Sequence, residues 1–278
     1  MGALTLTAPP AEEVAADPSR IITILSPKGG AGKTTAATNL AVGLAKHHPK
    51  DVVLVDLDLQ FGDVASNLRL SPASTILDVV RRWPCDTTQL KLALTPHHTG
   101  LYTLCAPLNP AEADEITAEH VSGIVRALHR SFTYVVVDTD PGLSERVLSA
   151  LDVSTDMVMI CSTEVPSIRG LKKALDALDV IGLTEARRLL VLNRSNAKVG
   201  VDVDALERTV GHTVDVRIPS SIDMVLATND GVPVMESERN PELVRAFQEL
   251  VDHFAPQDHD SSHGRGAGMR LFKRKASG

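Results

Sequence analysis

The stretch that decides the fold is IITILSPKGGAGKTTAATNLAVGLAKHH, residues 21–48. It starts with a short apolar run (21–25), continues through a glycine-rich loop and ends in a helical pattern. In that last part, apolar residues recur at the i, i+3, i+4, i+7 spacing of one helix face: Ala37, Leu40, Ala41 and Leu44. A strand, a glycine-rich loop and a helix in this order favour phosphate binding, because backbone N–H groups converge and the helix N-terminus adds a positive dipole.

Outside this stretch, short apolar runs alternate with helical patterns. The runs are rich in β-branched residues and lack regular polar alternation, which is typical of strands buried on both faces. They are IITIL (21–25), VVLVDLD (52–58), LYTLCAP (101–107), YVVVD (134–138), MVMIC (157–161), LLVLN (189–193) and VDVRIP (214–219). Later helices are expected at about 115–130, 143–151, 167–181 and 240–254. This alternation predicts an α/β fold, a mostly parallel twisted sheet with helices on both faces.

Composition sets limits on function. The 278 residues are 43% hydrophobic but only 3% aromatic, so the core must consist mainly of Val, Leu, Ile and Ala. A net charge of −7 does not support a bulk attraction to nucleic acid. The three cysteines lie far apart without CxxC spacing, which argues against a disulfide framework or a zinc site: Cys85, Cys105 and Cys161. Each is expected to be a small core residue in a reducing compartment.

The chain divides by composition into four segments. Residues 1–19 are expected to be a disordered lead without the pattern of a signal peptide, and residues 20–256 to form one large domain. Residues 257–267 are expected to be a flexible linker, and residues 268–278 a basic amphipathic tail. Since no apolar stretch reaches membrane-spanning length, the sequence predicts a cytoplasmic protein, which could still lie peripherally on the membrane.

The glycine-rich loop departs from the strict phosphate-loop pattern, whose first glycine position is occupied by Pro27. Lys33 is expected to reach the β- and γ-phosphates, Thr34 to ligate Mg²⁺, and Thr35 to lie nearer the α-phosphate. The backbone of the loop would cradle the phosphates through Gly29, Gly30, Ala31 and Gly32. The alternative is a glycine-rich turn that binds no ligand.

The motif KGGAGKTT (28–35) resembles the deviant Walker A box of the ParA/MinD family of ATPases. The resemblance implies an ATP-dependent homodimer in which Lys28 crosses the interface and contacts the phosphates of ATP bound to the second copy. Two triphosphates face to face concentrate negative charge, which a lysine from each side offsets. The alternative is that Lys28 is a solvated loop residue.

Two predicted strands end in acids, where ligands of parallel sheets bind. In VVLVDLDLQFGDV (52–64), Asp56 and Asp58 are two residues apart and are expected to point the same way. The resemblance implies that Asp58 orients the attacking water and that Asp56 supports Mg²⁺ or its water shell. Alternatively, both accept hydrogen bonds from backbone N–H groups at the strand end.

In YVVVDTDPGLSE (134–145), Asp138 has the pattern of a Walker B acid and is expected to hold a Mg²⁺-bound water. The resemblance implies that Gly142 offers its backbone N–H to the γ-phosphate. The family reads D-T-P-P-G here, and Asp140 replaces the first proline. An extra carboxylate near a triphosphate predicts slow turnover or weak ATP affinity, unless Asp140 points away and is solvated.

The resemblance also implies a nucleotide-base contact at LLVLNRSN (189–196), where Asn193 and Arg194 follow a strand. Pro219 would lie near the base, whereas Ser221 occupies a position where the family often has an acid. Alternatively, Asn193 is a cap at the C-terminal end of its strand.

The motifs DLDLQFGD (56–63) and STEVPSIRGLKKALDAL (162–178) resemble the CpaE/TadZ branch, MinD-like proteins that position pilus secretion machines. Iron-protein branches need paired cysteines, and tyrosine-kinase branches need a tyrosine-rich tail. The two tyrosines here, Tyr102 and Tyr134, are expected in the core. A secretion or pilus protein is therefore the expected partner.

Two alternatives remain, a ParA-like DNA-partitioning ATPase and a nucleotide-binding scaffold with little turnover. Leu59, where ParA proteins usually carry proline, and the acidic net charge make nucleic acid an unlikely partner. A local basic patch is still conceivable at Arg187, Arg188, Arg194 and Lys198.

The tail MRLFKRK (269–275) interleaves apolar residues with four basic ones. It resembles the short amphipathic helix with which MinD-type ATPases contact membranes. One copy would bind weakly, and two copies in a dimer would bind more firmly. The alternative is a disordered basic end.

Overall fold

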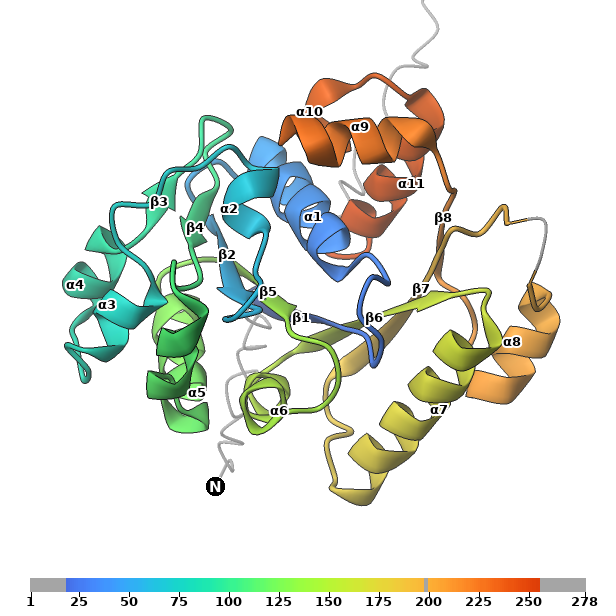
Figure 1. Ribbon diagram of the computed structural model, residues 1–278, viewed down its shortest axis with the longest axis horizontal. Coiled ribbons are helices and arrows are strands. Elements are labelled where there is room, and N and C mark those ends of the chain that lie inside the picture. The colour runs from blue at the N-terminus through green and yellow to red at the C-terminus, as the bar shows by residue number, and fades with distance from the viewer. Residues whose placement is uncertain (1–18, 198–199, 256–278) are drawn as a thin grey trace, which may run out of the picture.

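In the computed structural model, which describes residues 19–197 and 200–255, an eight-stranded sheet crosses the molecule (Figure 1). Its strand order is β3-β4-β2-β5-β1-β6-β7-β8, and each pairing is parallel except the antiparallel β3–β4 pair at one edge. The strands are β1 (Arg20–Leu25), β2 (Val52–Leu57), β3 (Thr95–Pro96), β4 (Tyr102–Leu104), β5 (Tyr134–Thr139), β6 (Asp156–Ser162), β7 (Arg187–Asn193) and β8 (Val216–Ile218).

Helices cover both faces of the sheet (Figure 1). One face carries α1 (Lys33–His47), α2 (Val64–Asn67), α9 (Ile222–Asp230), α10 (Val234–Ser237) and α11 (Pro241–Asp252). The other carries α3 (Ile76–Val80), α4 (Thr87–Leu92), the 3₁₀ helix η1 (Pro110–Glu115), α5 (Ala118–His129), α6 (Glu145–Asp152), α7 (Val165–Val180) and α8 (Val203–Val210). The predicted α/β fold is confirmed.

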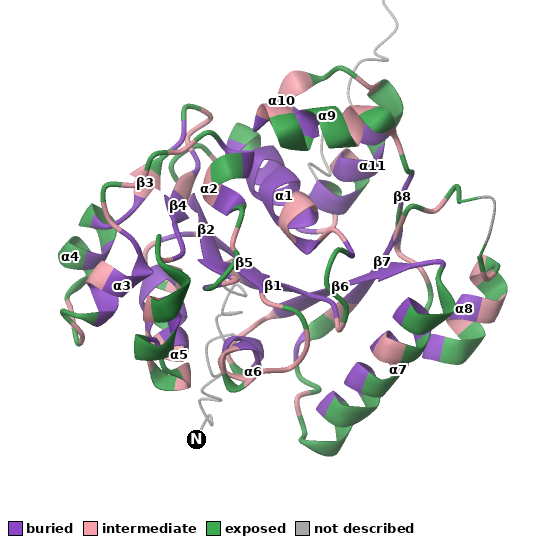
Figure 2. Ribbon diagram, in the orientation of Figure 1, coloured by how far each residue is buried: buried purple, intermediate pink, exposed green. Residues whose placement is uncertain are grey.

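The strands are apolar throughout because both of their faces are buried (Figure 2). In β1, Ile22 and Ile24 join the core beneath α1, whereas Ile21 and Leu25 enter the cores on the opposite face. Side chains alternate between the faces of a strand, so a continuous apolar run is what such a strand requires.

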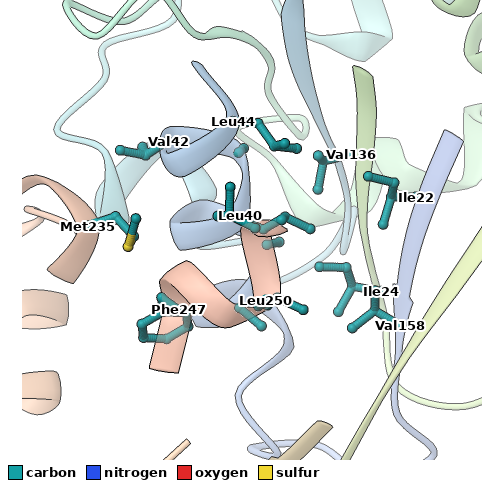
Figure 3. Packing of buried hydrophobic residues seen from close by; sticks show 14 of the residues in the cluster. Ile22, Ile24, Leu40, Val42, Leu44, Val136, Val158, Met235, Phe247 and Leu250 are labelled. Atoms are coloured by element: carbon teal, nitrogen blue, oxygen red, sulfur yellow. The ribbon is translucent and has the colours of Figure 1, made fainter. Parts of the chain in front are cut away.

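Helix α1 is buried on almost every side between the sheet and α10 and α11 (Figure 3). Its Leu40 and Leu44 face the strands, and Phe247 and Leu250 of α11 pack against it. A side chain at Gly43 would collide with Val251, so glycine lets the two helices approach closely. This packing fixes the start of α1, where the glycine-rich loop ends.

Each predicted strand has a counterpart, although β4 and β8 are shorter than the apolar runs that predicted them. Two burial predictions need correction: Tyr102 and Cys85 are only half-buried, whereas Tyr134, Cys105 and Cys161 are buried as expected. Within the described residues, no helix combines the length and apolarity needed to cross a membrane. The predicted linker (257–267), the tail (268–278) and nearly all of the lead (1–19) lie outside the described residues.

We expect Leu250→Ala to lower the free energy of unfolding by about 2–5 kcal/mol, because it leaves a cavity between α11 and α1. Leu250 is 0% exposed in that core. Urea titration followed by circular dichroism would measure the loss. Glu249→Ala, an exposed neighbour on α11, is the control and should change stability by less than about 0.5 kcal/mol. Equal stabilities of the two variants would contradict the packing described here.

Candidate functional site

The glycine-rich loop connects β1 to α1 at the carboxyl edge of the sheet. Gly30 and Gly32 adopt positive φ angles of 71° and 99°, a region that favours glycine. Gly32 is the N-cap of α1 and supplies no side chain to bond the first-turn N–H groups. A side chain at Gly32 would also collide with the amide of Asn193. The loop therefore presents backbone donors and a helix N-terminus to one side, as a phosphate site requires.

A pocket of about 550 Å³ lies over this loop, a volume suited to a nucleotide-sized ligand. The predicted site residues that line it come from four separate segments: Gly29, Gly30, Gly32, Lys33, Thr34, Thr35, Asp58, Asn193, Arg194 and Pro219. Five other predicted residues are not part of its lining: Lys28, Ala31, Asp56, Asp138 and Gly142.

Lys33 begins α1 and is only 6% exposed. Among residues 19–197 and 200–255, its ammonium has no ion-pair partner, and it interacts with Asp138 and Asp140 only at longer range. A buried ammonium without a close counter-charge is costly. The pocket is thus arranged to receive an anion at this point.

Asp56 and Asp138 lie side by side in the sheet, because β2 pairs with β5 in a register that places them opposite each other. Both are buried, and burial raises the pKa of each carboxyl group. Mutual repulsion also raises the pKa of Asp56. For Asp138, the hydroxyl of Thr34 and the charge of Lys33 act in the opposite direction.

Both carboxylate oxygens of Asp138 are buried without a hydrogen-bond partner among the described residues. The Thr34 hydroxyl approaches this carboxylate. A hydroxyl and an unpaired carboxylate are oxygen ligands of the kind that Mg²⁺ prefers. These two side chains therefore fit a magnesium ion or its water shell.

Asp56 and Asp58 differ in exposure, since Asp56 is buried and Asp58 lines the pocket. Strand β2 ends at Leu57, and the alternation of a strand does not extend to Asp58. The backbone N–H of Asp58 donates to Oδ1 of Asp56 at 3.1 Å, and a side chain at Gly62 would collide with the Asp56 carboxylate. Asp58 faces the pocket, whereas Asp56 is sealed beneath its loop.

The segment after β5 is tied to the phosphate loop. Gly142, at φ 91°, donates its N–H to the carbonyl of Ser26 at 3.1 Å, so this donor is already in use. Asp140 is half-buried, does not line the pocket and accepts a hydrogen bond from the Ser144 hydroxyl at 3.3 Å. Burial raises the pKa of Asp140. Asp140 therefore faces the start of α6, neither in the pocket nor fully solvated.

Lys28 lies on the exposed side of the loop, away from the pocket lining. Its ammonium donates to Oε2 of Glu164, the N-cap residue of α7, at 2.6 Å. This hydrogen bond and the lysine charge lower the pKa of Glu164. Within its own chain, Lys28 therefore pairs with a carboxylate at the surface.

The end of β7 supports the loop from the other side. The amide of Asn193 donates to the carbonyl of Ala31 at 2.8 Å, and its Oδ1 accepts from the N–H of Arg194 at 2.9 Å. Arg194, at φ 55°, reaches the carbonyl of Gly30 at 3.4 Å. Both polar ends of Asn193 are thus committed to backbone groups, which agrees with the strand-cap alternative.

Sequence reasoning missed the far side of the pocket. It is formed by Met224, Val225 and Thr228 of α9 and by Phe61, whose ring is 76% exposed. Helix α9 was not among the predicted helices, because its apolar residues do not form a single buried stripe. The only sequence signal for Phe61 as a pocket residue was its position in the motif DLDLQFGD, three residues after Asp58.

A family model described as an AAA domain matches residues 19–191. The septum site-determining protein MinD of Thermotoga maritima is 27% identical over 240 residues, covering 83% of this chain and 86% of MinD.

Two solved structures share the fold. The ParA family ATPase of Chlorobium tepidum has a TM-score of 0.79 at 21% identity and covers 85% of this chain and 99% of its own. MinD of Pyrococcus horikoshii, solved in complex with Mg-ADP, has a TM-score of 0.75 at 22% identity, covering 84% of this chain and 95% of its own. The match to the family model shows that the chain belongs to the AAA-domain family, and the chain is similar in sequence to MinD and in fold to ParA and MinD ATPases.

Proposed function

We propose that this protein is a nucleotide-switched positioning ATPase, which binds Mg²⁺ and ATP in the pocket over the glycine-rich loop. The observation that carries the proposal is the buried ammonium of Lys33, which has no ion-pair partner in the described part of the chain and lines that pocket. A triphosphate would supply the missing charge. The Mg-ADP bound to MinD of Pyrococcus horikoshii supports a nucleotide as the ligand.

In this proposal, Lys33 holds the β- and γ-phosphates, and the backbone N–H groups from Gly29 to Gly32 surround them. Thr34 and Asp138 hold Mg²⁺ or its water shell, and the ion offsets phosphate charge when bound. Thr35 lies toward the α-phosphate, and Pro219 and Arg194 toward the base. Because Asp56 and Asn193 already bond backbone groups, we assign them to holding the two loops in place.

Hydrolysis needs a water molecule aligned with the γ-phosphate. Asp58 lines the pocket and carries an acceptor that can orient that water. The N–H of Gly142 would reach the γ-phosphate only after leaving the carbonyl of Ser26. We infer that this exchange makes the segment after β5 sensitive to the nucleotide, and that turnover is slow.

The proposed active form is an ATP-bound dimer in which Lys28 leaves Glu164 and contacts the phosphates bound to the second copy. An exposed ion pair contributes only about 0–1 kcal/mol, so a triphosphate can displace it. Both members of the pair are about half exposed. This change of partner, from Glu164 to the phosphates on the second copy, would link nucleotide binding to formation of the dimer.

For the cellular role we propose the CpaE/TadZ branch, in which the dimer recruits or positions a pilus or secretion machine. The motifs 56–63 and 162–178 support this branch. Two members of the candidate basic patch are neutralised, since Arg187 pairs with Asp156 and Arg188 with Asp179. The patch is therefore a poor candidate for DNA binding.

We expect Lys33→Ala to weaken ATP binding at least ~30-fold, because removing a buried charge partner costs about 2 kcal/mol or more. Isothermal titration calorimetry with Mg-ATP would measure the affinity. Lys46→Ala, at the exposed end of the same helix, is the matched control and should bind like the parent. Unchanged affinity in Lys33→Ala would remove the nucleotide site from this proposal.

Lys28→Ala is expected to keep ATP affinity within ~3-fold while losing ATP-dependent dimerisation, since its proposed target lies on the other copy. Light scattering with ATP and with ADP would decide this. Glu164→Gln leaves Lys28 in place and should still dimerise, and Lys172→Ala on α7 controls for lost surface charge. If Lys28→Ala dimerised as the parent does, Lys28 would be an ordinary loop residue.

Co-sedimentation with anionic liposomes and with plasmid DNA tests the role of the dimer. We expect the full chain with ATP to associate with liposomes and not with DNA, and to lose this association when residues 268–278 are deleted. Added salt should weaken it by screening. Asp58→Ala should hydrolyse ATP more slowly and should therefore remain associated with the liposomes for longer. If the protein instead sedimented with plasmid DNA and not with liposomes, the DNA-partitioning alternative would be favoured.

A further inference from the structure

Two histidines and one glutamate meet at the edge of the sheet, away from the nucleotide pocket. His97 and His98 follow β3 in the loop to β4, and Glu236 lies on α10. His98 Nε2 is 3.1 Å from Oε1 of Glu236, and His97 Nε2 is 3.7 Å from Oε2. One donor atom from each of the three residues lies within 4.8 Å of the other two.

These separations suit a small cation. Four ligands placed tetrahedrally at ~2.0–2.1 Å from Zn²⁺ are ~3.3 Å apart. The two imidazole–carboxylate contacts, which end on different oxygens of Glu236, are 3.1 Å and 3.7 Å long and so lie close to this spacing. The His98 side chain is 68% exposed, so its ring is free to turn toward a shared ion. Two imidazoles and a carboxylate are ligands that first-row divalent metals accept.

His97 Nε2 and Glu236 Oε2 are positioned to bind a ligand. The His97 side chain is 4% exposed, and its Nδ1 bonds the Thr99 hydroxyl at 2.8 Å, which leaves Nε2 facing Glu236. Metal-binding histidines usually have their second nitrogen fixed in this way. Oε2 of Glu236 is buried without a hydrogen-bond partner in the part of the chain that the structure describes.

The two segments that carry the three residues are held in place by hydrogen bonds that their backbone forms. The histidine loop is closed by hydrogen bonds from His97 N–H to the Leu101 carbonyl (2.8 Å) and from Gly100 N–H to the His97 carbonyl (3.0 Å). On α10, the N–H of Met235 donates to Oδ1 of Asn39 in α1 at 3.0 Å. The backbone of both segments is therefore held by the fold, and of the three ligand side chains only the exposed His98 has to adjust.

The alternative without a metal is an ion pair that both histidines share with Glu236. It accounts for the 3.1 Å contact of His98 but leaves Oε2 of Glu236 without a donor. Arg69 borders the same surface pocket of about 380 Å³, and within the described residues it forms no ion pair with Glu236. The unsatisfied oxygen and the free His97 nitrogen face each other, which an ion between them would explain.

We propose that His97, His98 and Glu236 form a binding site for a first-row divalent metal ion of the Zn²⁺ type, with one position open to water in the adjoining pocket. The site uses no thiolate, so the spacing of the cysteines could not reveal it. The ion would join the sheet edge to α10. Helix α9, which lines the nucleotide pocket, directly precedes α10, so the ion would also restrain that side of the pocket.

Calorimetric titration of the untagged full chain with Zn²⁺, after treatment with a chelator, tests the proposal. We expect one Zn²⁺ per chain, and at least ~10-fold weaker binding in His98→Ala and in Glu236→Gln. Co²⁺ should give the visible absorption of a tetrahedral site in the parent only. Excess Mg²⁺ should not compete, because imidazole nitrogens suit it poorly.

His47→Ala is the matched control, since His47 is an exposed histidine at the end of α1 and distant from Glu236 in sequence. It should bind Zn²⁺ like the parent and show the same rise in melting temperature with Zn²⁺, which both site variants should lose. His98 is exposed, so His98→Ala should fold even if Glu236→Gln does not. Absence of Zn²⁺ binding in the parent, or equal binding in His98→Ala, would overturn the proposal.

Discussion

The structure depends on an imbalance of charge at the carboxyl edge of the sheet. Lys33 is buried at the start of α1 without an ion-pair partner among the described residues, and two adjacent strands bury Asp56 and Asp138 next to each other, where Lys33 acts on Asp138 only at longer range. A protein interior accepts such groups only when something compensates for their lost hydration. Asp56 accepts a hydrogen bond from the N–H of Asp58, whereas both oxygens of Asp138 lack a hydrogen-bond partner among the described residues and are favoured mainly by the nearby Thr34 hydroxyl and the charge of Lys33. The fold supplies a lysine and a carboxylate whose natural complements are an anion and a cation held together.

Such a site costs stability, so the loop around it must be fixed by other contacts. Two strand ends and a helix provide them: Gly142 after β5 bonds Ser26, Asn193 of β7 bonds Ala31, and Gly32 caps the buried helix α1. None of these contacts involves the side chain that would touch phosphate. The loop is therefore shaped by neighbours that are far apart in sequence, and its backbone donors are oriented before any ligand arrives.

The parts of the fold and the site that depend on local interactions could be predicted from the sequence, whereas the parts that depend on contacts between distant residues could not. The strand–loop–helix unit and the buried strands were predictable, because composition and spacing within one segment determine them. The two-residue strand β3 carries no periodicity of its own, and α9 buries only Ala227 while Ile222 and Leu226 remain exposed. The contact of Asn193 with Ala31, and the meeting of His97 with Glu236, join residues more than one hundred positions apart. Only the packed fold brings these pairs together.

The same reasoning separates the two lysines of the loop. Lys33 is buried, so its charge is available only to a ligand inside the pocket, and losing that ligand leaves the charge without compensation. Lys28 is exposed and paired with Glu164, so its charge remains hydrated and balanced in the free chain. An exposed pair of this kind is weak and exchanges readily with another anion. A fixed buried charge therefore suits the binding of a nucleotide, whereas an exchangeable surface charge suits the detection of one that arrives on a second molecule.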